Sequence, residues 1–215
     1  MNTTPALCRL VALCAVSFCL IGCSLVKPPK GVTPRSFVLT PVSVPSPTAR
    51  TESTNMAVGI RPVKMPGYLS TKALTMRQRN NEIVHLESLV WAERLDTALQ
   101  RVLADDIGSL IPTDQVRLSR WAPEAVAVEV DVNVDRFDAD SEGRAVLTAW
   151  WRLLSPGDEK VIASGRFSAA RKGPPPNTDP LGATTLMSNL ASSLAETLVR
   201  AIKESKSSRD EKPAA

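Results

Sequence analysis

The stretch VAVEVDVNV, residues 126–134, decides the fold of this chain. Valine occupies every second position, and the positions between carry alanine, glutamate, aspartate and asparagine. Side chains of a β-strand point alternately to opposite faces, so this spacing predicts one β-branched face and one polar face. We therefore expect a half-buried antiparallel strand whose acidic face is solvated.

Two further strands are predicted directly after this one. Residues 140–143 and 155–158 are rich in Asp, Ser, Pro and Gly, which favours turns. Residues 144–154 and 161–167 read as strands. Three strands joined by short turns predict an antiparallel meander.

The rest of the chain adds short strands and two helices. Apolar residues three and four positions apart predict amphipathic helices over residues 93–111 and 186–202. Shorter apolar runs predict strands at 37–39 and 57–63, and a hairpin around Asn80-Asn81. The predicted fold class is α+β, a mostly antiparallel sheet with two amphipathic helices packed on one face.

Trp150 and Trp151 are neighbours in the second predicted strand, so their side chains point to opposite faces. Trp151 continues the apolar face and is expected in the core. Trp150 then faces outward as a contact anchor for a partner, or it lies under the second helix if that face is covered. In the apolar turn at 65–69, either Tyr68 and Leu69 contact a partner or Tyr68 caps the core.

Residues suited to catalysis or metal binding are few. His85 is the only histidine, and neither a G-x-S-x-G elbow nor a Gly-rich phosphate loop occurs. Glu129, Asp131 and Asp135 share a predicted strand face, but carboxylates two positions apart on a strand lie about 7 Å apart. A calcium ion needs six or more oxygens close around it. We therefore expect no metal, no cofactor and no enzymatic activity.

The N-terminal 22 residues read as a signal peptide. Arg9 precedes an apolar run of about a dozen residues, shorter than the ~20 that span a membrane. Leu20-Ile21-Gly22-Cys23 is similar to a bacterial lipobox, which would make Cys23 the acylated first residue (diacylglycerol and palmitate-type chains) of the mature protein. More than one acyl chain gives stable anchoring. The alternative is an unprocessed leader with an incidental cysteine.

The predicted organisation follows from this cleavage. Residues 1–22 are the signal peptide, 23–35 a lipidated tether, 36–203 the folded domain and 204–215 a disordered tail. Removing the signal peptide leaves 25 basic and 22 acidic residues, a net charge of +3. Such a balance does not favour nucleic-acid binding. Ser24, after the cysteine, favours the outer membrane over the inner one.

Several motifs in order resemble the ABC-type transport auxiliary lipoprotein family, the paraquat-inducible protein C-like subunits of membrane-integrity transporters. They are residues 63–69 (VKMPGYL), 91–93 (WAE), 130–132 (VDV), 136–138 (RFD) and 151–154 (WRLL). The similarity spans about residues 37 to 202, although no single motif is diagnostic.

This resemblance implies a non-enzymatic subunit of an intermembrane lipid transport system. The implied partners are a periplasmic MCE-domain protein and its inner-membrane permease, with the chain anchored in the outer membrane on its periplasmic face. A homo-oligomer is a further expectation. The alternative is a stand-alone periplasmic module that binds a lipid or another apolar ligand between helix and sheet.

Overall fold

The computed structural model describes residues 33–42, 56–111, 115–118 and 121–210. The predicted signal peptide, Cys23 and most of the tether therefore lie outside the described residues. The elements are β1 (Arg35–Phe37), β2 (Val58–Ile60), β3 (Ala73–Arg77), β4 (Ile83–Trp91), α2 (Leu95–Leu110), β5 (Val116–Leu118), β6 (Val128–Asp140), β7 (Arg144–Leu154), β8 (Val161–Lys172) and α3 (Pro180–Asp210). Short 3-10 turns lie at Gly67–Leu69, Arg79–Asn81 and Pro123–Ala125.

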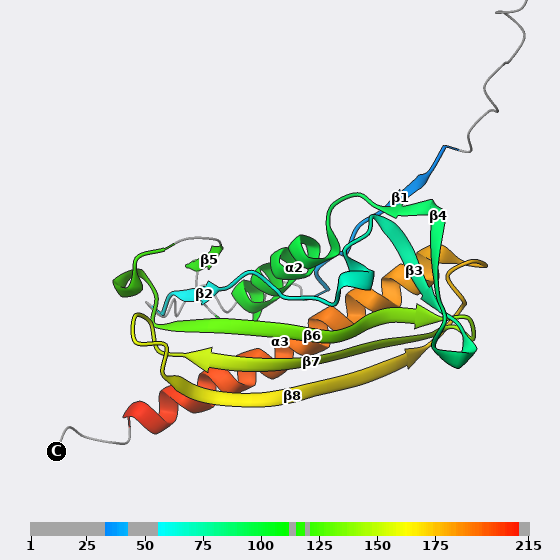
Figure 1. The fold of residues 1–215 in the computed structure, drawn as a ribbon. Coiled ribbons are helices and arrows are strands. Elements are labelled where there is room, and N and C mark those ends of the chain that lie inside the picture. Colours follow the sequence, from blue (N-terminus) through cyan, green and yellow to red (C-terminus); the bar gives the residue numbers. More distant parts are fainter. Residues whose placement is uncertain (1–32, 43–55, 112–114, 119–120, 211–215) are drawn as a thin grey trace, which may run out of the picture. The chain divides into compact units, whose positions relative to one another are not determined.

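Strand β6 is the centre of the sheet (Figure 1). One of its edges pairs with β7 along most of its length, and β7 pairs in turn with β8. The other edge is shared, because β2 pairs with its N-terminal half and β3 with its C-terminal end. Beyond these, β5 lies next to β2, β4 lies next to β3, and β1 forms the border next to β4. The predicted meander is confirmed as β6–β8.

The sheet is mixed, which corrects the prediction of a mostly antiparallel one. The pairs β1–β4, β2–β5, β2–β6 and β3–β6 are parallel. Parallel neighbours need a crossover connection, and here α2 lies between β4 and the return of the chain to β5 and β6. Periodic alternation within a strand carries no information about the direction of its neighbour.

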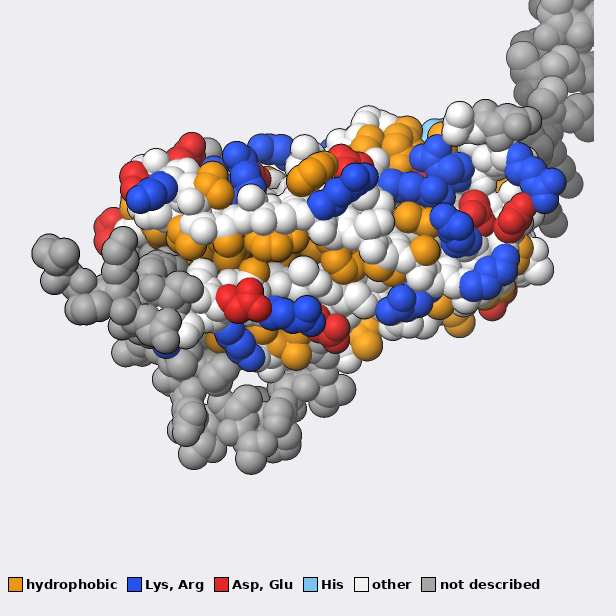
Figure 2. Space-filling view, turned by 90° about the horizontal axis from the view of Figure 1, so that it is seen from below, with side chains coloured by type: hydrophobic (Ala, Val, Ile, Leu, Met, Phe, Trp, Pro, Cys, Tyr) orange, Lys and Arg blue, Asp and Glu red, His pale blue; other side chains and the backbone are white. Residues whose placement is uncertain are grey.

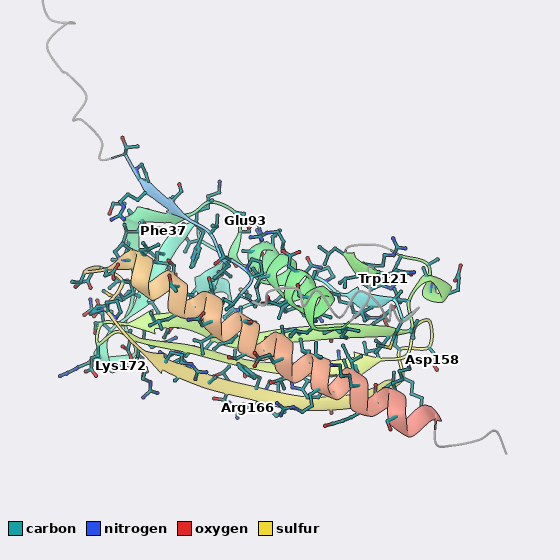
Figure 3. All side chains as sticks on the ribbon, turned by 180° about the vertical axis from the view of Figure 1, so that it is seen from behind. Phe37, Glu93, Trp121, Asp158, Arg166 and Lys172 are labelled. Atoms are coloured by element: carbon teal, nitrogen blue, oxygen red, sulfur yellow. The ribbon has the colours of Figure 1, made fainter. Side chains whose placement is uncertain are left out.

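Both helices lie on one face of the sheet, as predicted: α3 packs on β6, β7 and β8, and α2 packs against α3 and β5. Figure 3 shows α3 in front of the strands, and Figure 1 shows it behind them. Leu190, Leu194, Leu198 and Ile202 are fully buried at spacings of four and pack in the same core as Val130 and Val132. Burying each such side chain stabilises the fold by roughly 1.5–3 kcal/mol.

Helix α3 is longer than the sequence analysis expected. It has 31 residues and continues through 204–210, the first part of the predicted disordered tail. No proline or glycine follows Ile202 until Pro213, so no residue in between ends the helix. Ser205 is still buried, so the helix remains packed beyond the end of its apolar stripe. This part of the tail prediction is wrong; residues 211–215 lie outside the described residues.

A β-bulge divides β6 into two halves. The pairing with β7 shifts between Val134 and Arg136, so Asp135 is the inserted residue. Before the bulge the buried apolar residues have even numbers, and after it they are Phe137 and Ala139. The inserted residue keeps the apolar side of a 13-residue strand on the core despite this change of phase.

The segment after β1 lies against both helices. Arg101 of α2 donates to the carbonyl of Leu39 at 2.9 Å, and the Thr40 amide donates to the Ser188 hydroxyl of α3 at 3.2 Å. Within the described part of the chain, neither helix is long and apolar enough to span a membrane.

Candidate functional site

The face of β6–β8 opposite the helices, which we call the outer face, buries three carboxylates. Glu129, Asp131 and Asp138 are only 6%, 5% and 0% exposed. The sequence pattern predicted a solvated face for Glu129, Asp131 and Asp135; this prediction is wrong for Glu129 and Asp131, while Asp135 is exposed as expected. A buried carboxylate is stable only when it is paired and hydrogen-bonded, and arginines from other segments pair with each of them.

Asp138 is the most buried of the three and binds Tyr68 and two arginines. The Tyr68 hydroxyl and Arg77 Nη2 each donate to its Oδ2 at 3.0 Å, and Arg136 Nε donates to its Oδ1 at 2.8 Å. The Arg77 guanidinium also lies 5.4 Å from the centre of the Tyr68 ring. These contacts hold the Pro66-Gly67-Tyr68 turn on the outer face.

This environment raises the pKa of Tyr68. Burial of the phenol is the largest cause, and the charge of Asp138 and the hydrogen bond to it add to the effect, giving a pKa of about 12. Tyr68 therefore stays protonated at physiological pH and acts as a hydrogen-bond donor to Asp138.

Glu129 is held at the other end of the outer face. Arg61, just after β2, donates from Nε to Glu129 Oε2 at 2.7 Å, and Trp121 Nε1 donates to Oε1 at 3.0 Å. The Trp121 ring lies against Gly59, where a Cβ atom would come within 2.5 Å of it. Figure 3 labels Trp121 beside this end of the sheet.

Trp150 is the large exposed side chain of the outer face. It is 51% exposed, whereas Trp151 is 9% exposed and belongs to the core. The prediction that the two indoles point to opposite faces is confirmed. Arg166 of β8 lies 5.4 Å from the centre of the Trp150 ring, and Figure 3 shows Arg166 midway along β8. On the core side, Gly165 leaves room for Trp151, because a Cβ there would lie 2.6 Å from its ring.

A cavity of about 270 Å³ lies beside Trp150. Its lining residues are Lys64, Asp131, Asn133, Trp150, Trp151, Arg152 and Ser164. Asp131, Arg152 and Ser164 are cross-strand neighbours in one row, and Asn133 and Trp150 form the next row. Lys64 extends the β2 segment along β6: its amide donates to Val132 at 3.1 Å and its carbonyl accepts from Val134 at 2.8 Å.

Basic side chains gather on the solvent side of this face. Arg152 and Lys64 have side chains that are 50% and 67% exposed, and Arg166 is also exposed. Seen from below the view of Figure 1, Lys and Arg side chains lie on both sides of a band of hydrophobic side chains (Figure 2). The outer face thus combines buried acids with exposed cations and one exposed indole.

Comparison with protein families gives one decisive match. Residues 37–199 match the model of the ABC-type transport auxiliary lipoprotein component family. The chain belongs to this family. The resemblance noted from the sequence motifs is thereby confirmed, and membership of a lipoprotein family indicates a membrane-associated place in the cell envelope.

Solved structures share the fold of this auxiliary lipoprotein. A protein from Xanthomonas campestris, XCC0632 of family DUF330, is 15% identical with a TM-score of 0.69, over 83% of this chain and 99% of that one. An uncharacterized protein is 17% identical with a TM-score of 0.65, over 79% of this chain and 99% of that one. A search of curated protein sequences gives no significant match.

The predicted site residues of this auxiliary lipoprotein fall in different environments. Leu69 is 3% exposed and packs in the core, so its side chain does not lie on the surface. Tyr68 is half-buried and its hydroxyl binds Asp138. Trp150 is exposed on the neighbouring strand β7. It lies four residues beyond Val146, which is the residue of β7 opposite Asp138. Cys23 lies outside the described residues. Contact of Tyr68, Leu69 or Trp150 with a partner stays a prediction.

His85 and the acidic residues form no metal site in the part of the chain that the structure describes. His85 is exposed on β4, with Nδ1 3.4 Å from the Thr75 hydroxyl. The arginine partners of the buried acids were not predicted from the sequence. Arg61 and Arg77 come from segments more than 60 residues away from Glu129 and Asp138, and no local pattern links them.

Proposed function

We propose that this protein is an outer-membrane lipoprotein that docks the periplasmic conduit of an MCE-type lipid transport system. It would be anchored through Cys23 and face the periplasm. Its family description as an ABC-type transport auxiliary lipoprotein component is the observation that carries the proposal. The auxiliary role also supports a protein that contributes binding surface and no catalysis.

The proposed anchor rests on the N-terminal sequence. The apolar run followed by Leu20-Ile21-Gly22-Cys23 fits a lipobox, and Ser24 favours sorting to the outer membrane. Diacylglycerol and a third acyl chain on one cysteine would hold the protein stably in a bilayer. Residues 24–34 contain three prolines, which favours an extended tether between the anchor and the domain.

The proposed docking surface is centred on Trp150. Aromatic and arginine side chains dominate the binding energy of protein interfaces, and here an exposed indole is surrounded by Arg152 and Arg166. Tyr68 is half-buried, packs against the core and reaches the same face with its hydroxyl, which binds Asp138. The proposed partner is the periplasmic MCE-domain protein, whose inner-membrane permease would complete the system.

Co-purification from detergent-solubilised envelopes tests the docking role. The tagged full chain should retain the MCE-domain protein, and Trp150→Ala should reduce the retained amount roughly tenfold, as expected for an interface anchor. Tyr68→Ala should reduce it less. Leu181→Ala is the matched control, because Leu181 is 64% exposed on α3 and thus on the helical side of the sheet.

Two results would contradict the proposal. Mass analysis of the mature protein could find no acyl groups on Cys23, which would remove the anchor. The docking role would also be wrong if Trp150→Ala and Tyr68→Ala left the retained amount of the MCE-domain protein unchanged and deletion of the gene left envelope integrity unchanged. A lipid bound stoichiometrically to the purified protein, with no partner retained, would instead favour a stand-alone lipid-binding module.

A further inference from the structure

The cavity beside Trp150 has a net positive lining. Lys64 and Arg152 contribute two cations and Asp131 one anion, and Asn133 and Ser164 add neutral polar groups. Arg152 donates from Nε and Nη2 to Asp131 Oδ2, which neutralises that pair. One positive charge therefore remains for a ligand, and a singly charged anion balances it.

Asp131 lines the cavity, and one of its carboxylate oxygens is buried without a hydrogen-bond donor. Its side chain is more than nine-tenths buried, and its Oδ1 accepts no hydrogen bond from any described residue. The nearest cation is Lys64 Nζ at 3.8 Å, beyond hydrogen-bond distance. A buried carboxylate oxygen without a donor is costly, so a ligand hydroxyl that reaches it when the exposed Lys64 side chain moves aside would be recognised specifically.

The indole of Trp150 supplies an apolar wall. It is half exposed, and Arg166 stacked at 5.4 Å restrains the ring. Aliphatic C–H groups of a polyol pack well against such a ring, while their hydroxyls reach the neighbouring polar groups. A cation pair, an orphaned acceptor and an aromatic wall thus meet around about 270 Å³.

From this arrangement we infer that the cavity binds a phosphoglycerol group, a singly charged phosphodiester that carries glycerol hydroxyls. Lys64 pairs with the phosphate, and Arg152 donates to it from Nη1 while its Nε and Nη2 stay on Asp131. Asp131 Oδ1 accepts from a glycerol hydroxyl, and Trp150 covers the glycerol carbons. The inference requires no partner protein, so it stands or falls separately from the proposed docking role. The group can come from a bilayer phosphatidylglycerol or from a soluble glycerophosphodiester.

The test uses the full chain purified from membranes in an uncharged detergent. Glycerophosphoglycerol and inorganic phosphate are titrated separately, and binding is followed by calorimetry and by tryptophan fluorescence. Saturable binding of glycerophosphoglycerol, at least tenfold tighter than phosphate, is expected. Nanodiscs of phosphatidylglycerol, compared with nanodiscs of phosphatidylcholine, then show whether the bilayer headgroup binds more tightly than the soluble one.

Variants assign the binding to the cavity. The double variant Lys64→Gln with Arg152→Gln should weaken binding by roughly tenfold or more, since charge-assisted hydrogen bonds are lost. In Asp131→Asn, the amide oxygen still accepts from Arg152, and the NH₂ group takes the place of Oδ1. A glycerol hydroxyl then loses its acceptor, so the preference for glycerophosphoglycerol over phosphate should vanish. Arg171→Gln is the control, because Arg171 is an exposed cation of β8 on the other side of the sheet.

Circular dichroism confirms the fold of each variant, and Trp150→Ala provides a substitution at an exposed position that should also weaken binding. Three results would overturn the inference. They are no saturable binding by the unmodified protein, equal affinity for phosphate and glycerophosphoglycerol, and affinity unchanged in the Lys64 and Arg152 double variant. Binding of acidic peptides in place of either phosphate ligand would likewise overturn it and identify a protein-binding surface.

Discussion

The two faces of the β6–β8 meander are buried by different means. The inner face packs Val130, Val132 and Leu153, all fully buried, against the helices. The outer face buries Asp131 and Asp138 nearly as deeply, but it does so with guanidinium groups. Depth of burial alone therefore does not reveal which forces hold a strand in place.

The two kinds of burial contribute differently. Apolar packing is non-directional, and its contribution to stability follows the area removed from water. A buried ion pair has a large desolvation cost and adds little net stability, but losing one partner is expensive. The buried acids therefore favour one arrangement of the neighbouring segments. Only when the segments that carry Arg61 and Arg77 lie beside β6 are Glu129 and Asp138 paired with a cation.

The largest expected effect is on the inner face. Phe137→Ala should lower the free energy of unfolding by about 3–5 kcal/mol, because it empties a fully buried ring position. Urea unfolding followed by circular dichroism measures this. Val161→Ala, at a position 47% exposed, should change stability by less than about 0.5 kcal/mol. Similar losses for both variants would refute the assignment of the core to the inner face.

A smaller loss is expected on the outer face. Asp138→Asn should cost about 2–3 kcal/mol, less than a fully buried pair, because Arg77 and Arg136 still reach solvent. Asp135→Asn in the exposed bulge is the matched control. If both substitutions shift the urea midpoint equally, the Asp138 network does not stabilise this face.

Gly59 offers a finer probe of the outer face. Gly59→Ala places a Cβ atom 2.5 Å from the Trp121 ring, so the ring must move and its hydrogen bond to Glu129 should break. The expected loss is about 1–2 kcal/mol, with a change in tryptophan fluorescence. Gly67→Ala is the control, since a Cβ there meets no heavy atom within 4 Å. An unchanged fluorescence spectrum in Gly59→Ala would contradict the proposed packing.

The smallest expected effect is a change in one titration curve. Tyr68 is the only tyrosine, so tyrosinate absorbance reports its pKa directly, about 12 in the folded protein against an ordinary 10.0. The folded state holds this proton more tightly, so the contribution to stability is complete below pH 10 and is lost as pH rises through about 12. Tyr68→Phe should lack this part of the pH dependence.

Asp138→Asn should lower the pKa of Tyr68 without restoring the ordinary value, because burial of the phenol remains the largest cause of its shift. A folded-state pKa near 10 in the unmodified protein would show that the phenol is not held as described.

Local patterns predicted much of the fold. Alternation at 126–134 identified the central strand, apolar spacing identified both helices, and adjacent positions in a strand separated Trp150 from Trp151. The bulge is also visible in the sequence, since apolar positions change phase between Val134 and Phe137. What the patterns lacked was strand direction, because the parallel partners of β6 come from segments about 60 to 70 residues away.

The candidate site was harder to predict for the same reason. Trp150 was found because exposure follows from strand alternation. The burial of Asp131 and the cavity beside it were not predicted. The cavity includes Lys64, which lies beside β6 only because the chain after β2 continues along that strand. The register that sets Arg152 opposite Asp131 also depends on the one-residue shift at Asp135.

Strand β8 has a consequence for how copies of this domain meet. Among the described residues it pairs only with β7, so its other border presents main-chain donors and acceptors along 12 residues. Arg166 lies near its midpoint, so two copies joined antiparallel along this border would bring their Arg166 guanidinium groups together. Repulsion between these like charges would oppose such edge-to-edge pairing of two β8 strands.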